Sequence, residues 1–117
     1  SGRKKLALRW AIRAMAESPD RRENWYEMEK AAYYLEKWDG VVFAGSQCVQ
    51  RTKRSGTCIN DAEAWGAAPW DLLSIGLWHT GDKAGAINAA TRAAELEPEN
   101  KRINDNLLFF CKEATAT

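Results

Sequence analysis

The chain has 117 residues, which is enough for one domain with a modest hydrophobic core. Seventeen basic and sixteen acidic residues leave a formal net charge of +1, which argues against an electrostatic nucleic-acid binder. No apolar run approaches the length of about 18 residues that a membrane-spanning helix needs, so we expect no membrane span.

Helical periodicity dominates the first half of the chain. The helices expected there cover residues 4–17, 22–35, and from the turn at 37–39 to about residue 53. Asp20 and Glu23 have the spacing of a capping box at the start of the second helix. Residues 55–66, which include two glycines, are expected to form an irregular insertion with a short helical turn.

The clearest helix–turn–helix pattern follows the insertion. Large side chains recur at the spacing of one helical face, at Trp70, Leu73 and Leu77. Gly81 can end that helix in a left-handed conformation, and Asp82 can cap the next one. The second helix has small residues at helical spacing, which allow close packing on the first: Ala86, Ala90 and Ala93.

A last helix is expected after Pro98, over residues 101–113. A terminal helix of this kind covers the open end of a helical array. The apolar residues available for that contact are Ile103, Leu107, Leu108 and Phe110.

The same pattern recurs 45 residues earlier, which indicates an internal repeat. Trp25, Met28 and Ala32 correspond to Trp70, Leu73 and Leu77, and Val41, Gly45 and Cys48 correspond to the alanine face. One further step back, of about 34 residues, predicts small residues at 7, 11 and 14 and a proline at 19. The sequence has Ala7, Ala11, Ala14 and Pro19 at these places.

A period of about 34 residues with large and then small helical faces resembles the tetratricopeptide repeat (TPR). The resemblance implies an all-α fold, a solenoid of antiparallel helix pairs with about six helices. We expect a single domain with the following parts: a half repeat at 3–18, a repeat at 20–54, the insertion at 55–66, a repeat at 67–99 and a capping helix at 100–114.

Binding residues are expected on the concave side of such a solenoid, which the first helix of each pair lines. Aromatic faces with a few polar groups suit a peptide, an extended loop or a sugar. The candidate ligand- or partner-binding residues are Tyr26, Lys30, Tyr33, Tyr34, Asp71, Ile75, Trp78, His79, Arg102 and Phe109. The alternative is that residues such as Tyr33 and Trp78 only complete the packing between repeats.

Catalysis has little support in the sequence. His79 is the only histidine, and the sequence shows no nucleophile or orienting partner for it. We find no phosphate loop, zinc-ligand spacing or nucleophile elbow, and therefore expect no cofactor and no metal. A small enzyme that uses His79 with Asp71 or Asp82 is the less favoured alternative.

A more specific resemblance lies in four stretches: RENWYEM (22–28), LEKWDG (35–40), EAWGAAPWDLL (63–73) and GDKAGAINAATRAAELEPENKRINDNL (81–107). They resemble the helical TPR region that follows the catalytic domain in some bacterial and phage family 2 glycosyltransferases. The resemblance implies that this chain is an accessory part of a larger enzyme. The Asp-x-Asp motif and alternating strands of the catalytic domain are absent here.

The sequence thus predicts a non-catalytic interaction or scaffold domain that positions an acceptor or a partner. The expected partner is a protein or peptide, such as a glycosyltransferase catalytic domain or its acceptor. A self-assembly module that forms a homo-oligomer is the alternative. Three cysteines without metal-ligand spacing and no signal-peptide pattern favour a cytoplasmic location.

Overall fold

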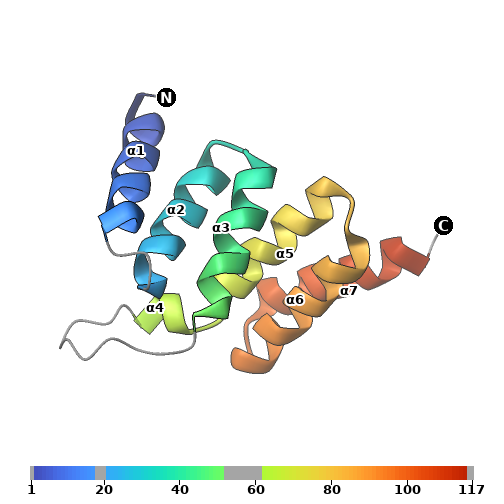
Figure 1. The fold of residues 1–117 in the computed structure, drawn as a ribbon. Coiled ribbons are helices and arrows are strands. Elements are labelled where there is room, and N and C mark those ends of the chain that lie inside the picture. The colour runs from blue at the N-terminus through green and yellow to red at the C-terminus, as the bar shows by residue number, and fades with distance from the viewer. Residues whose placement is uncertain (1, 18–20, 52–61, 116–117) are drawn as a thin grey trace.

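The fold is an array of helices, seen in a computed structural model that describes residues 2–17, 21–51 and 62–115 (Figure 1). Every regular element in these ranges is a helix, which confirms the all-α prediction. The helices are α1 (Gly2–Glu17), α2 (Arg22–Tyr34), α3 (Trp38–Gln50), α4 (Ala62–Trp65), α5 (Ala68–Thr80), α6 (Lys83–Leu96) and α7 (Lys101–Thr115). None of the described helices is long and apolar enough to cross a membrane.

Most helix boundaries lie close to the expected ones, with one correction. The third helix begins at Trp38, inside the stretch expected to be a turn. The N-cap of α2 is Arg21, which makes no side-chain cap hydrogen bond. The carboxylate of Glu23, the other residue of the expected capping box, accepts a hydrogen bond from Trp65 Nε1 at 2.9 Å. Asp20 lies outside the described residues.

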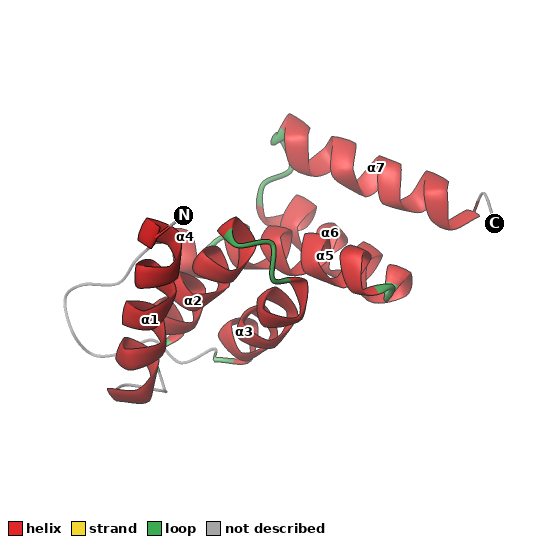
Figure 2. Cartoon of the chain, turned by 90° about the horizontal axis from the view of Figure 1, so that it is seen from above, coloured by secondary structure: helices red, strands yellow, loops and turns green. Residues whose placement is uncertain are grey.

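Apart from the short α4, which packs on α5 and α2, successive helices pack antiparallel on one another, and α1 and α7 lie at opposite ends of the array (Figure 2). Small residues let the helices approach closely. A β-carbon added at Gly76 would lie 2.8 Å from Val41 Cγ1, so α5 contacts α3 through a position where only glycine fits without a shift.

The small-residue faces are buried, as the sequence predicts. Ala86, Ala90 and Ala93 of α6 and Val41 and Cys48 of α3 are all at most 2% exposed. The corresponding side chains of α1, at Ala7, Ala11 and Ala14, lie outside the described part of the chain, as does Pro19.

The terminal helix α7 covers the end of the fold with fewer residues than expected. Ile103 and Phe110 are buried against α5 and α6, and Leu107 is partly buried there. Leu108 is 69% exposed, so its predicted role in covering the end was wrong. The reason is the helical angle, since residue 108 lies about 100° from residue 107 on the helix surface.

The turns after α2 and α5 have the same hydrogen bonds. In both, a residue just after the helix donates its N–H to a carbonyl five residues back: Lys37 to Ala32 at 2.9 Å, and Asp82 to Leu77 at 2.9 Å. This pattern needs a left-handed residue after the helix. Gly81 takes that conformation after α5 with φ 96°, whereas Glu36 takes it after α2 with φ 56°. Asp82 then caps α6 by accepting a hydrogen bond from the Gly85 N–H at 2.8 Å, as predicted.

The helix boundaries follow two fixed offsets. Shifted by 45 residues, α2 falls on 67–79 and α3 on 83–95, each within one residue of α5 and α6. Shifted back by 34 residues, α3 falls on 4–16, within two residues of the bounds of α1. Shifted forward by 34 residues, α5 falls on 102–114, within one residue of the bounds of α7. The insertion between α3 and α5 accounts for the longer offset.

Candidate functional site

Helices α2, α5 and α7 line a groove of about 180 Å³, and α4 adds one residue to its wall. Its lining residues are Tyr26, Lys30, Tyr33, Tyr34, Glu63, Ala68, Asp71, Leu72 and Arg102. Six of the ten residues expected in a binding site thus line a single groove, although they come from three helices. We call it the α2–α5–α7 groove.

Tyr26 forms part of the groove but presents almost no surface. It is 1% exposed, and its hydroxyl donates a hydrogen bond to Glu63 Oε1 at 2.7 Å. The Lys30 ammonium lies 4.5 Å from the Tyr26 ring centroid and 2.8 Å from Glu27 Oε1. Tyr26 therefore holds α4 against α2 and leaves ligand contact to its more exposed neighbours.

Asp71 and Arg102 join α5 to α7 across the groove. Asp71 is buried, and its two carboxylate oxygens accept hydrogen bonds from Arg102 at 3.3 Å and 2.5 Å. These hydrogen bonds raise the pKa of the Arg102 guanidinium. Because the two charges satisfy each other, an anionic ligand would have to compete with Asp71 for Arg102.

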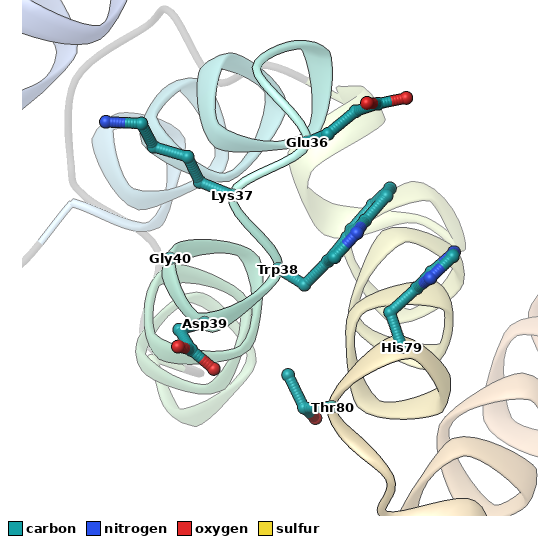
Figure 3. Close-up of a pocket in the computed structure, with 7 residues that line it drawn as sticks. All are labelled: Glu36, Lys37, Trp38, Asp39, Gly40, His79 and Thr80. Atoms are coloured by element: carbon teal, nitrogen blue, oxygen red, sulfur yellow. The ribbon is translucent and has the colours of Figure 1, made fainter.

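Four aromatic side chains form a continuous row from the groove to the end of α5. Tyr34 meets Tyr33 edge-on at 5.8 Å, and Tyr33 meets Trp38 edge-on at 5.8 Å. Trp38 stacks flat on His79, with ring centroids 4.0 Å apart and planes 5° from parallel (Figure 3). We call Tyr34, Tyr33, Trp38 and His79 the aromatic row.

The aromatic row offers hydrogen-bonding groups as well as ring surface. Tyr34 is 57% exposed and His79 is also exposed. Among the described residues, the hydroxyls of Tyr33 and Tyr34 and the indole N–H of Trp38 have no hydrogen-bond partner. A ligand with both apolar faces and carbonyl or hydroxyl acceptors can therefore use the rings and these donors together.

His79 lies in a wide opening of about 650 Å³ beside the turn after α2. Figure 3 shows Glu36, Lys37, Trp38, Asp39, Gly40, His79 and Thr80 around it. Neither carboxylate named as a catalytic partner is hydrogen-bonded to His79, because Asp71 binds Arg102 and Asp82 caps α6. The described residues contain no cluster of three or more metal-ligating side chains.

Three other candidate residues lie where α5 meets α7, outside the groove lining. Trp78 stacks on Phe110 at 4.7 Å and meets Phe109 edge-on at 5.9 Å. Ile75 packs in the same partly buried cluster. The arrangement of Trp78 and Ile75 fits the alternative in which these residues complete packing between helices, whereas Phe109 remains 51% exposed.

Sequence reasoning missed Trp38 and two charged residues beneath the site. Trp38 was assigned to a turn, and its partner His79 is distant in the chain. Arg22 is 6% exposed and donates hydrogen bonds to four backbone carbonyls, of Cys48, Val49, Arg51 and Ala64, at 2.8–3.4 Å. It thereby caps the C-terminal end of α3 and fixes α4.

Glu29 is the second missed residue. It is 0% exposed between α2, α3 and α5, and neither carboxylate oxygen has a hydrogen-bond partner. Burial, and then the negative charge of Asp71, raise the pKa of Glu29 well above its usual value, while Arg22 lowers it. A β-carbon at Gly45 would overlap the Glu29 carboxylate, so glycine makes the room for it. The available signal was its place on the buried face of α2, four residues after Trp25 and three before Ala32.

Comparison with known proteins adds no assignment. No protein-family model matches the chain, and no curated protein matches it significantly.

Proposed function

We propose that this chain is a non-catalytic interaction domain of TPR-type helix pairs that binds an extended peptide segment of a partner protein. The proposed binding surface is the α2–α5–α7 groove together with the aromatic row. The observation that carries the proposal is that six separately expected residues line one groove, beside aromatic side chains whose polar groups have no described partner.

The repeat interpretation has support from the helix boundaries. The offset of 45 residues relates α2 to α5 and α3 to α6. The offset of 34 residues relates α1 to α3 and α5 to α7. With these offsets, α2, α5 and α7 are equivalent first helices, and all three line the groove. In helical-repeat proteins such a shared surface is the usual place for a ligand.

An extended peptide suits the chemistry of this surface. Its backbone carbonyls have no internal partners, so they can accept hydrogen bonds from Tyr33, Tyr34 and Trp38. Its apolar side chains can pack on the rings. The groove is already formed in the free protein, which keeps the ordering cost of binding low.

The resemblance to glycosyltransferase accessory regions suggests which peptides to test. We propose that the partner is a segment of a separate catalytic domain or of a protein acceptor. In this role the chain positions the partner and transfers no sugar itself.

The test is a selection of unstructured peptides on the wild-type protein, followed by affinity measurement on variants. Replacing Tyr33 and Tyr34 together by alanine is expected to weaken a selected peptide by roughly 2 kcal/mol, or about thirtyfold. The matched control is Phe43→Ala, which removes an aromatic side chain of similar exposure, 52%, from α3. The affinity of this variant for the selected peptide should equal that of the wild type.

Two results would refute the proposal. One is a selected peptide that binds the tyrosine double variant as tightly as the wild type. The other is that the protein binds nucleotide sugars and no peptide. This result would favour the alternative of a catalytic site around His79. Concentration-dependent light scattering of the wild type would favour the self-assembly alternative instead.

A further inference from the structure

The first helix has a net positive charge, whereas the rest of the chain has a net negative charge. α1 has five basic residues, Arg3, Lys4, Lys5, Arg9 and Arg13, and one acidic residue, Glu17. The whole chain has seventeen basic and sixteen acidic residues. The remainder therefore has twelve basic and fifteen acidic residues, so a helix of net charge +4 is attached to a body of net charge −3.

The exposed face of α1 also has large apolar side chains. Leu6 is 53% exposed, Trp10 58% and Ile12 42%. Leu6 and Trp10 lie one helical turn apart, and Arg9 and Arg13 form the next row. These four residues line a shallow hollow of about 340 Å³, in which the Arg13 guanidinium lies 5.5 Å from the Trp10 ring centroid.

The charges on this face are not neutralised within the described part of the chain. Arg3, Lys5, Arg9 and Arg13 form no ion pair with a described carboxylate, in contrast to Lys30, Arg92, Lys101 and Arg102. Arg9 and Arg13 repel each other at i,i+4 spacing, which costs a few tenths of a kcal/mol in an isolated helix. A surface of this kind favours an anionic partner.

We propose that α1 docks on an anionic lipid surface. The helix lies along the surface, its arginines and lysines contact the headgroups, and Leu6 and Trp10, one helical turn apart, enter the boundary with the acyl chains. Tryptophan is enriched at that boundary, and long basic side chains extend from an apolar helix body to the headgroups.

The position of α1 permits this docking. Among the described helices, α1 lies at one end of the array and packs on α2 (Figure 1). A membrane of negative surface potential attracts this end and repels the body of net charge −3, so the molecule binds in one orientation. The α2–α5–α7 groove does not include α1 and stays free for its own ligand.

The apolar residues favour lipid over two other partners. Nucleic-acid phosphates would use the arginines, but Leu6 would remain exposed to water. A second copy would have to bring its own apolar end, α7, whose outer side has Lys101 and Lys112. Lys101 is paired with Asp105 there, but Lys112 would face the basic residues of α1.

The experiment is co-sedimentation of the protein with phosphatidylcholine vesicles, with and without phosphatidylserine, at low and high salt. We expect binding only with phosphatidylserine, and weaker binding at high salt. Changing Arg9 and Arg13 together to glutamine should weaken it roughly thirtyfold, because each basic residue near the surface contributes about fivefold. Arg92→Gln combined with Lys112→Gln removes the same charge from α6 and α7 and should leave binding nearly unchanged.

Insertion is tested separately with brominated lipid, which quenches nearby tryptophan fluorescence. Part of the quenching should disappear in Trp10→Phe. The proposal is overturned by equal binding to neutral and anionic vesicles, by an equal loss in the α6–α7 control, or by quenching that Trp10→Phe leaves intact. An anionic oligonucleotide that binds through Arg9 and Arg13 while vesicles do not would also overturn it.

Discussion

Glu29 makes the stability of this protein depend on pH in a direction opposite to that of most carboxylates. Its pKa is raised in the folded state, chiefly by burial and then by Asp71, from an ordinary value of 4.5. Between the unfolded and the folded pKa, the native state holds a proton that the unfolded chain has lost. The free energy of unfolding therefore falls as the pH rises through this interval, and no such loss occurs below about pH 4.5.

The magnitude follows from the linkage between protonation and folding. Each pH unit within the interval removes about 1.4 kcal/mol of stability. Glu29→Gln keeps the shape of the protonated side chain and cannot ionise. As the pH rises, the variant should therefore gain up to about 1.4 kcal/mol of stability over the wild type per pH unit. In a chain of this length, that corresponds to roughly 4 °C or more in the melting temperature.

The assay is urea unfolding followed by far-ultraviolet circular dichroism, from pH 5 to pH 8. The matched control is Glu27→Gln, on the same helix, whose side chain is 54% exposed and pairs with Lys30. The stability of the control should follow that of the wild type at every pH. Parallel curves for the wild type and Glu29→Gln would refute the reasoning, because Glu29 would then ionise alike in both states.

Three further predictions concern single side chains. Arg22→Met should destabilise the fold by about 3 kcal/mol, since it leaves three carbonyls at the end of α3 and one in α4 without their donor; urea titration measures this, and a loss under 1 kcal/mol would contradict it. Glu36→Gly should raise stability by roughly 0.5–1 kcal/mol, because glycine accepts the left-handed turn without strain; an unchanged or lower melting temperature would count against strain there. Iodoacetamide should alkylate exposed Cys111 well before Cys48, whose pKa burial and the nearby Glu29 raise to about 12; equal labelling rates in the native protein would show that α3 opens readily.

The helices were largely predictable because their signals are local. The large and small faces of α5 and α6 and the Gly81–Asp82 turn each depend on residues within a few positions of one another. The start of α3 was misplaced because Glu36, a residue that rarely adopts positive φ, takes the turn position that glycine holds after α5. Leu108 was misjudged because the apolar run 107–110 is longer than one helix face.

The site was less predictable because its decisive contacts join distant segments. Six residues of the groove could be predicted from the faces that they occupy on the expected helices. The burial of Tyr26, however, depends on Glu63, 37 positions away, and the aromatic row depends on Trp38 meeting His79. Charged residues such as Arg22 and Glu29 read as surface positions, because only the folded backbone supplies the carbonyls or the glycine gap that accommodates them.

The packing of each helix on its neighbours in chain order has a mechanical consequence. In such an array few contacts join distant parts of the chain, so we expect its helices to unfold one after another under load. Besides its packing on α6, helix α7 is fastened to α5 by the Asp71–Arg102 bridge and the Trp78 ring contacts. A pull on the C-terminal end would release α7 first and open one wall of the groove while α2, α3 and α5 remain folded.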